Sequence, residues 1–315
     1  MTPPILFLVF NRPDTTARVF EAIRRARPAR LYVAADGARA ERQGEAGRCA
    51  ETRRIATAVD WPCEVRTLFR DQNLGCRLGV STAIDWFFEH EQEGIIIEDD
   101  CVPSPSFFPY CAELLDRYRH DERVMCISGD NPAGSMPRHD ASYAFSRYPL
   151  IWGWATWRRA WRLYDVDMSN WPRFRDAGRL RGCLDDEFLQ RYWREIFNRA
   201  AAGEIDSWAY RWTFSCWFNG GLTSVPRLNL VSNIGFGPEA THTLQSDSAR
   251  ANLPVRELQW PLVHPDFVAR DAVADAAIRK VAFPAPPRPL TWLESVRFKI
   301  GLRTRIKRHL ARLAP

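Results

Sequence analysis

The amino-acid sequence predicts an α/β fold with a doubly wound sheet, and two observations support this class. First, apolar runs of strand length alternate with longer segments of helical spacing over the first third of the chain. Second, the first run, residues 5–10 (ILFLVF), is continuously apolar, which is typical of a strand buried on both faces of a parallel sheet. Parallel strands need crossover connections, usually helical, and this is the order that the sequence has.

Each predicted element has its own signal. Residues 15–27 follow a break at Asn11-Arg12-Pro13-Asp14 and place Val19, Phe20 and Ile23 on one side of a helix. The next segments are a strand at 31–35, a polar helix within 39–59, an alternating strand at 63–69, an amphipathic helix at 78–90, a strand at 94–97 and a strand at 124–128. We therefore expect a sheet whose ligands bind beyond the carboxyl ends of its strands.

The second half of the chain differs in composition. Residues 152–217 hold nine of the chain's 13 tryptophans, mixed with charged residues without a clear period. We expect this half to pack over the first and to shape a pocket. The proline-rich residues 284–289 (PAPPRP) cannot continue a helix and are interpreted as a spacer. The predicted division is two halves of one domain, residues 1–125 and 126–265, and a C-terminal extension, residues 266–315.

Positive charge is concentrated at the C-terminus. The chain has 315 residues and a formal net charge of +6. Residues 291–315 contain seven Arg or Lys and one Glu, so the rest of the chain is balanced. A balanced body disfavours nucleic-acid binding. Because apolar residues recur at roughly helical spacing between the basic ones, residues 290–315 are predicted as an amphipathic helix on an anionic membrane surface. The alternative is a helical end packed on the body.

The cysteine and apolar patterns indicate a cytoplasmic protein. None of the eight cysteines forms a C-x-x-C pair, so a structural zinc site has no support. No signal peptide is recognised, and no apolar run approaches the roughly 20 residues that span a bilayer. We therefore expect a cytoplasmic location with reduced thiols, and peripheral attachment to the inner face of the membrane through the basic tail.

The strongest candidate for chemistry is the acidic triplet Glu98-Asp99-Asp100, directly after the predicted strand at 94–97. Three adjacent carboxylates repel one another, so a site that holds them close needs a cation. Mg²⁺ and Mn²⁺ take oxygen ligands from one or two carboxylates and share the remaining positions with a diphosphate. Such a metal neutralises charge on a leaving diphosphate as a Lewis acid. A solvated turn is the alternative, which the adjoining buried strand disfavours.

The triplet belongs to a longer resemblance. Residues 95–108 (IIIEDDCVPSPSFF) resemble the donor-site segment of N-acetylglucosaminyltransferase I and related GT-A glycosyltransferases. Six further motifs resemble the same family in order: 8–13 (LVFNRP), 33–37 (VAADG), 73–75 (NLG), 151–161 (IWGWATWRRAW), 206–208 (DSW) and 226–235 (PRLNLVSNIG). The likeness runs from residue 5 to about residue 245 and is loose between the motifs.

The resemblance implies a GT-A fold and an inverting transfer of a sugar from a UDP-sugar to a glycan or a lipid-linked saccharide. Residues 1–125 would bind the nucleotide sugar, and residues 126–265 would form the acceptor side. Asp100 and His242 would bind Mn²⁺ or Mg²⁺, and Asp206 would be the general base. The implied donor contacts are Phe10, Asn11, Arg12, Asp36, Asn73, Glu98, Asp99 and Trp154.

Three assignments stay open. The family's base lies in a stretch with two adjacent Asp residues, whereas Asp206 stands alone, so Asp185-Asp186-Glu187 competes for that role. His242 is equally well explained as a surface-loop histidine. Most tryptophans of the second half are expected in the core, with Trp154 or Trp208 as the first candidates for stacking on a sugar.

Two other functions were weighed. A sugar nucleotidyltransferase shares the doubly wound core, but it would need a glycine-rich phosphate loop after the first strand, which residues 11–14 (NRPD) do not offer. A non-catalytic protein that binds membrane surfaces would explain the basic tail but would leave the acidic triplet without a role.

Overall fold

The structure is a computed structural model that describes residues 1–136, 140–236 and 250–284. His242 and the basic segment 290–315 lie outside the described residues, so the expectations for them stay predictions. Within the described ranges, no helix is long and apolar enough to cross a bilayer.

The first half alternates strands and helices as the sequence predicts. Its elements are β1 (Ile5–Val9), α1 (Pro13–Ala26), β2 (Arg30–Ala35), α2 (Glu45–Ala56), β3 (Glu64–Phe69), α3 (Gly75–His90), β4 (Glu93–Glu98), β5 (Cys101–Pro103) and α4 (Phe107–Arg117). α1 begins earlier than predicted because Pro13 occupies its first position, where a missing N–H breaks no helical hydrogen bond. α2 begins only at Glu45, after Gly44 with a left-handed φ of 76°.

The second half mixes short strands with helices. Its elements are β6 (Val124–Ser128), β7 (Tyr143–Ser146), β8 (Trp154–Trp157), α5 (Arg158–Trp161), α6 (Trp171–Asp176), α7 (Leu180–Cys183), α8 (Glu187–Ala201), α9 (Ala209–Phe218), β9 (Leu222–Pro226), β10 (Val231–Asn233) and α10 (Ala272–Ala282). β6 is the strand predicted at 124–128. The tryptophan-rich stretch folds mainly into β8 and the helices α5 to α9.

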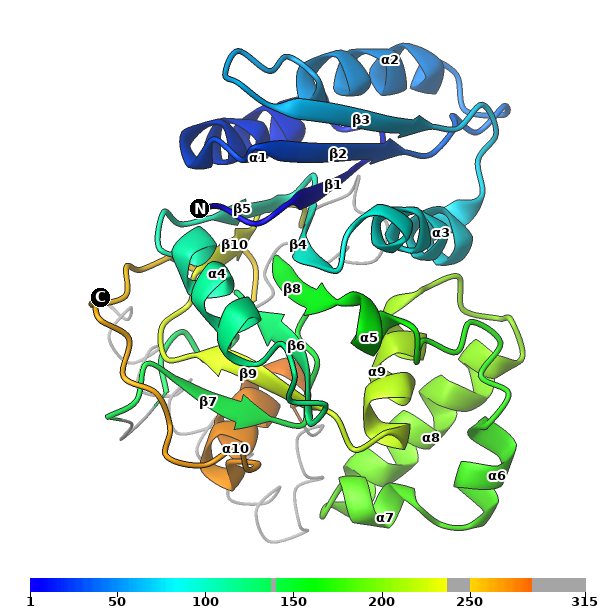
Figure 1. The fold of residues 1–315 in the computed structure, drawn as a ribbon. Coiled ribbons are helices and arrows are strands. Elements are labelled where there is room, and N and C mark those ends of the chain that lie inside the picture. The colour runs from blue at the N-terminus through cyan, green and yellow to red at the C-terminus, as the bar shows by residue number, and fades with distance from the viewer. Residues whose placement is uncertain (137–139, 237–249, 285–315) are drawn as a thin grey trace, which may run out of the picture. The chain divides into compact units, whose positions relative to one another are not determined.

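One eight-stranded mixed sheet joins the two halves, in the order β3-β2-β1-β4-β8-β6-β9-β7 (Figure 1). Strands β3, β2, β1 and β4 are parallel, whereas β8 runs antiparallel to both β4 and β6. A separate antiparallel pair joins β5, which follows β4 after the two aspartates, to β10. The predicted α/β class with a doubly wound mixed sheet is confirmed.

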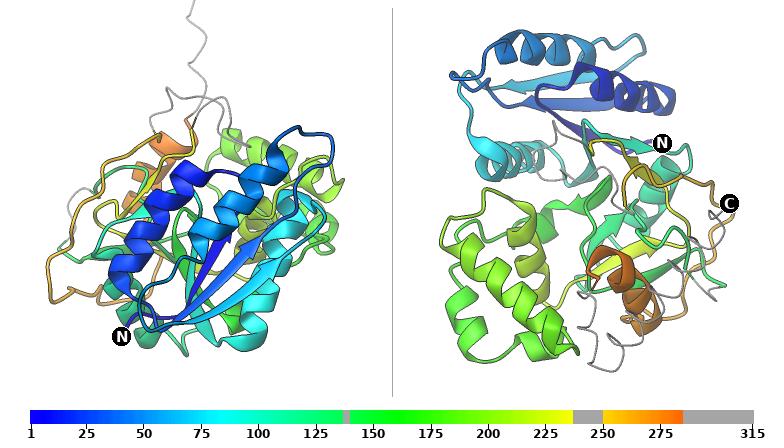
Figure 2. Two further views of the ribbon diagram at one scale, coloured as in Figure 1. Left: turned by 90° about the horizontal axis from the view of Figure 1, so that it is seen from above. Right: turned by 180° about the vertical axis from the view of Figure 1, so that it is seen from behind.

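The central strands β2, β1, β4, β8 and β6 are buried on both faces, as the continuous apolar run predicts for β1, whereas the edge strand β3 is mostly exposed. In β1, Ile5, Phe7 and Val9 belong to a core with α1, α2 and α4, whereas Leu6 and Leu8 belong to a core with α3 and the helices of the second half. Figure 2 shows α1 and α2 side by side over the first strands. The two layers of helices leave the carboxyl ends of the parallel strands as the edge where a ligand can enter.

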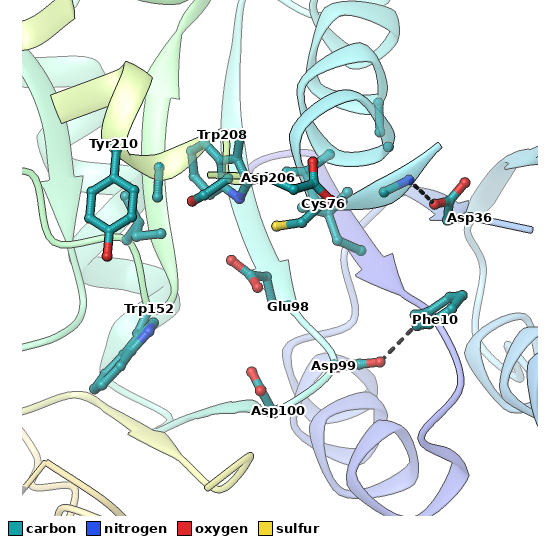
Figure 3. Close-up of a pocket in the computed structure, with 18 of the residues that line it drawn as sticks. Phe10, Asp36, Cys76, Glu98, Asp99, Asp100, Trp152, Asp206, Trp208 and Tyr210 are labelled. Atoms are coloured by element: carbon teal, nitrogen blue, oxygen red, sulfur yellow. Dashed lines mark hydrogen bonds between the residues drawn. The ribbon is translucent and has the colours of Figure 1, made fainter. Parts of the chain in front are cut away.

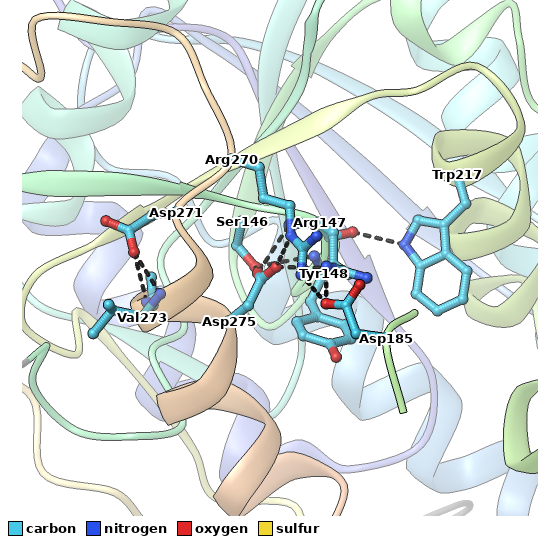
Figure 4. Close-up of polar contacts among 10 residues, drawn as sticks. Ser146, Arg147, Tyr148, Asp185, Trp217, Arg270, Asp271, Val273 and Asp275 are labelled. Atoms are coloured by element: carbon cyan, nitrogen blue, oxygen red, sulfur yellow. Dashed lines mark hydrogen bonds and ion pairs between the residues drawn. The ribbon is translucent and has the colours of Figure 1, made fainter. Parts of the chain in front are cut away.

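A buried network of ion pairs fixes α10 to the sheet (Figure 4). Asp275 accepts hydrogen bonds from Ser146 Oγ at 2.6 Å and from Arg147 Nε at 2.8 Å. Its Oδ2 also pairs with Arg270 Nε at 2.5 Å. The compact unit therefore includes residues 266–283, which the sequence division assigned to the C-terminal extension.

Candidate functional site

A pocket of about 590 Å³ lies at the carboxyl ends of β1, β2 and β4, and both halves of the chain line it. Of the residues predicted from the sequence, the pocket brings together Arg12 and Asn73 with Phe10, Asp36, Glu98, Asp99, Asp100 and Asp206. Figure 3 labels the last six. The fold thus collects residues from distant segments at the sheet edge where ligands of open α/β sheets bind.

Two predicted donor contacts lie away from the pocket lining. The side chain of Asn11 donates to Glu45 Oε1 at 2.8 Å, at the start of α2. Trp154 is fully buried and stacks on Trp208, with ring centroids 5.6 Å apart. Because β8 lies between β4 and β6, Trp154 faces the core, and the pocket is lined instead by Trp208 and Trp152.

The acidic triplet stands at the end of β4 and faces the pocket. Asp99 Oδ2 accepts a hydrogen bond from the Phe10 amide at 3.0 Å. Asp100 Oδ2 forms an ion pair with Arg12 Nη1 at 2.8 Å. Glu98 points into the pocket (Figure 3). The triplet is therefore tied to Phe10 and Arg12 in the connection between β1 and α1, where the sequence predicted donor contacts.

Burial and mutual repulsion disfavour the charged forms of this triplet. The pKa of Glu98 is raised to about 8, first by burial and then by the carboxylates of Asp100 and Asp99. The pKa of Asp99 is raised to about 7, again by burial and then by Asp100. Arg12 opposes both shifts. A further cation in the pocket would relieve the remaining repulsion.

The triplet suits a hard divalent cation that is shared with a ligand. Its donors are carboxylate oxygens, the type that Mg²⁺ and Mn²⁺ prefer. Among the residues that the structure describes, no three His, Cys, Asp or Glu side chains converge as a ready-made metal cage. A metal held here would therefore take its other ligands from a diphosphate or from water, as Mg²⁺ commonly does.

Asp36 and Asp206 together cap the first turn of α3. The four amides of residues 74–77 have no acceptor within the helix. Asp36 accepts hydrogen bonds from the first two and Asp206 from the last two, at N···O distances of 2.9–3.1 Å. Gly75 has a left-handed φ of 77°, and a Cβ there would lie 2.5 Å from Asp206 Oδ2. Both predicted functional aspartates thus also hold the backbone, which sequence reasoning missed because Asp206 is 130 residues from Cys76.

Asn73 joins the same junction between β2 and α3. Its Nδ2 donates to the carbonyl oxygen of Gly37 at 2.8 Å. Burial raises the pKa of Asp36, and the backbone N–H groups that donate to its carboxylate partly offset this rise. The motifs at 33–37 and 73–75, which hold the predicted donor contacts Asp36 and Asn73, are therefore joined by hydrogen bonds between their own residues.

The motif at 226–235 brings the backbone over Asp100. β10 pairs with β5, and the Ile234 amide donates to the carbonyl oxygen of Asp100 at 2.8 Å. A Cβ on Gly235 would lie 1.9 Å from Asp100 Oδ2, so glycine is what leaves room for the carboxylate. The backbone closes one side of Asp100, while the side chain still lines the pocket.

Arg250 also lines the pocket, and sequence reasoning missed it. Its guanidinium lies 3.9 Å from the ring centroid of Trp152 and pairs with Asp130 Oδ2 at 3.3 Å. Burial raises the pKa of Asp130 to about 6, against the effect of Arg250. No local motif marks Arg250, because Asp130 lies 120 residues earlier in the chain.

An aromatic wall from the second half faces the carboxylates. It is formed by Tyr192 and Trp193 of α8, Tyr210 of α9 and Phe283, which follows α10. In Figure 3, the Tyr210 ring and the Trp152 ring lie on the same side of Glu98, opposite to Phe10. Aromatic faces of this kind stack on sugar rings or pack against apolar chains.

The cluster Asp185-Asp186-Glu187, the other candidate for the general base, contains two residues that stabilise the fold. Asp185 pairs with Arg270 at 3.0 Å in the network around α10 (Figure 4). Asp186 caps α8 by accepting a hydrogen bond from the Leu189 amide at 3.0 Å. Of the two candidates for the base, Asp206 is the one that lines the pocket.

Comparisons with known proteins assign no family to this chain. No protein-family model and no curated protein matches it. Among solved structures, UDP-glucose pyrophosphorylase complexed with UDP-glucose is similar over 74% of this chain and 93% of its own, with 6% identity and a TM-score of 0.38. HddC from Yersinia pseudotuberculosis is similar over 50% of this chain and 77% of its own, with 9% identity and a TM-score of 0.31. Its complex with GMP-PN has a TM-score of 0.32. Likenesses this distant assign no activity.

Proposed function

We propose that this protein is a metal-dependent, inverting glycosyltransferase that moves a sugar from a UDP-sugar to a glycan or a lipid-linked saccharide. The observation that carries the proposal is the acidic triplet that faces a pocket lined by both halves of the chain. A volume of about 590 Å³ is typical of a small-molecule site. The pocket also lies at the sheet edge where α/β folds bind their ligands.

The first half would hold the donor. Asp100 offers carboxylate oxygens to the metal, and Arg12 offers a guanidinium to the diphosphate. Asp99, held by its hydrogen bond from the Phe10 amide just after β1, would contact the ribose or the sugar. The nucleobase would lie toward Asp36 and Asn73, where β2 meets α3. When bound, the metal would supply Lewis-acid stabilisation to the leaving diphosphate.

The second half would hold the acceptor. An inverting displacement needs a carboxylate that takes the proton from the attacking hydroxyl, on the side opposite to the leaving diphosphate. Asp206 is the proposed base, and it lies across the pocket from Asp100 in Figure 3. The aromatic wall, with Tyr192 and Tyr210 among its members, offers surfaces on which acceptor sugars can stack.

A sugar nucleotidyltransferase is the second candidate. It would use the same sheet edge, metal and nucleotide, and UDP-glucose pyrophosphorylase is among the distantly similar structures. We rank it second because only Phe10, Asn11 and Arg12 separate β1 from α1, and none of them is a glycine. That connection lacks the glycine-rich loop that would wrap a triphosphate.

One experiment separates the two activities. The protein is incubated with UDP-glucose and Mn²⁺, with either pyrophosphate or a panel of acceptor sugars, and the nucleotides are resolved by chromatography. Attack of pyrophosphate on the uridylyl phosphorus gives UTP and sugar 1-phosphate, whereas transfer of the sugar to a hydroxyl gives UDP. If UTP forms with pyrophosphate and no UDP forms with any acceptor sugar, the nucleotidyltransferase replaces the glycosyltransferase as the proposed function.

The donor class is tested by thermal shift with UDP-, GDP- and CMP-sugars, each with and without Mn²⁺. A ligand that binds only the folded state raises the melting temperature. We expect the largest Mn²⁺-dependent rise with a UDP-sugar. Stabilisation by GDP- or CMP-sugars in preference to every UDP-sugar would overturn the UDP assignment.

A further inference from the structure

Arg12 and Asp100 form a shielded ion pair in the pocket. Arg12 is the last residue before α1, and its Nη1 lies 2.8 Å from Asp100 Oδ2. The two side chains are only 19% and 13% exposed. Opposite charges attract more strongly in such a place than on an open surface. Arg12 therefore balances the charge of the carboxylate that is the proposed metal ligand.

Both oxygens of Asp100 have neighbours that limit the approach of a metal. Oδ2 faces Arg12, and the Gly235 backbone leaves no room there for even a Cβ. Oδ1 accepts a hydrogen bond from the thiol of Cys101 at 3.4 Å. A divalent cation that bound this carboxylate would come close to the guanidinium, and the two positive charges would repel each other. Arg12 and a metal are thus competitors for Asp100.

We propose that Arg12 is a built-in counter-ion of Asp100, which opposes metal binding until the diphosphate of the donor draws the guanidinium away. This inference rests on the proposed function. Phosphate oxygens accept bidentate hydrogen bonds from arginine, so a diphosphate in the same pocket offers Arg12 an alternative partner. The carboxylate is then released for the metal.

The consequence is ordered assembly of the site. The metal binds the free protein weakly and binds tightly together with the nucleotide, because the diphosphate of the nucleotide offers Arg12 an anion in place of Asp100. Linkage is reciprocal, so the metal strengthens nucleotide binding by the same factor. Removal of Arg12 should therefore act in opposite directions on the two ligands.

The test is a titration of the full-length protein with Mn²⁺ alone, followed by electron paramagnetic resonance of the free ion. Relative to the wild type, Arg12→Gln should bind Mn²⁺ about tenfold more tightly, the size of a common coupling between two sites. The same variant should bind UDP in the presence of Mn²⁺ more weakly. Arg12→Lys, which keeps the charge, should bind Mn²⁺ nearly as the wild type does.

Arg70→Gln is the matched control. Arg70 also lines the pocket, but it donates to Thr82 Oγ1 at 2.7 Å, and its charge acts on Asp36. Its loss removes the same charge without freeing Asp100, so the Mn²⁺ affinity should stay near that of the wild type. Equal tightening in both glutamine variants would mean a general charge effect and would overturn the inference.

The remaining outcomes separate the inference from the function on which it rests. If Arg12→Gln binds Mn²⁺ as weakly as the wild type or more weakly, while Asp100→Asn abolishes binding, the counter-ion role is wrong and the metal site stands. If neither the wild type nor Arg12→Gln binds Mn²⁺, with or without UDP, the metal-dependent function fails together with the inference. Melting temperatures of all variants verify that each protein is folded.

Discussion

At the scale of single residues, the aspartates of the site combine two roles. Asp36 and Asp206 line the pocket, yet their oxygens accept the amides of α3. Asp100 lines the same pocket and is paired with Arg12. A pattern of residue types predicts that such carboxylates are functional, but it cannot reveal which backbone groups they also hold.

Asp100→Asn should remove the Mn²⁺-dependent part of the affinity for UDP. Asparagine keeps the shape of the side chain but loses the negative charge that a divalent ion needs. We expect a loss of about tenfold or more, since even indirect partners of a metal contribute that much. Calorimetric titration of UDP with and without Mn²⁺ measures it. An unchanged difference between the two titrations would remove Asp100 from the metal site.

Asp206→Asn should retain donor binding and lower the transfer rate by about a hundredfold or more, because general base catalysis contributes at least that factor. Asparagine has one acceptor oxygen where aspartate has two, so the cap on α3 weakens by about 1 kcal/mol. Turnover and urea unfolding are measured on the same preparation. Lower stability with full turnover would show that Asp206 is a cap and that the base lies elsewhere.

At the scale of elements, apolar patterns located β1 to β4 and β6, but they missed the short strands β5 and β7 to β10 and the ends of the helices. β2 and β4 appear within one residue of the predicted bounds, because a buried strand is apolar along most of its length. β3 is mostly exposed, and its bounds follow instead from its alternating pattern. α3 begins three residues earlier than predicted, at Gly75. Its first residues offer no local side-chain cap, and the carboxylates that do cap it come from elsewhere in the chain.

The attachment of α10 gives a prediction at this scale. Asp275→Ala should lower the free energy of unfolding by about 3–5 kcal/mol, because it removes the buried carboxylate that pairs with the buried guanidinium of Arg147 and leaves it the exposed Asp185. Urea unfolding followed by circular dichroism measures the change. Asp176→Ala, which removes an exposed pair with Arg175, serves as the control and should have little effect. An equal decrease in the free energy of unfolding in both variants would mean that the buried ion pairs stabilise the protein no more than an exposed pair does.

At the scale of the whole molecule, one sheet carries both halves of the site. β8 is inserted antiparallel between β4 and β6, and this brings the tryptophan-rich segment beside the acidic triplet. Among the residues that the structure describes, the last to line the pocket is Phe283, within the compact unit Met1–Phe283. We predict that the donor site works without the basic tail.

Deletion of residues 290–315 tests that prediction. If the tail is the proposed membrane helix, its loss should abolish cosedimentation with vesicles rich in phosphatidylserine, because the basic and apolar residues that would hold the surface are removed. UDP affinity with Mn²⁺ should be unchanged. Vesicles of neutral phosphatidylcholine are the control. Undiminished binding of the shortened protein to anionic vesicles would place the membrane contact outside the tail.

The sequence by itself determined the class of the fold, the order of the first strands and the residue types at the carboxyl end of β4. These features depend on residues that are adjacent in the chain. Consecutive apolar residues predict a buried strand, and the acidic triplet directly follows such a strand. Tertiary structure alone decided that Trp154 is core, that Asp185 and Asp186 serve the fold, and that Arg250 reaches the pocket. Each of these outcomes depends on contacts with residues that are far away in the chain. Side-chain packing and the pairing of charges in three dimensions decide those contacts, and a local sequence pattern does not contain them.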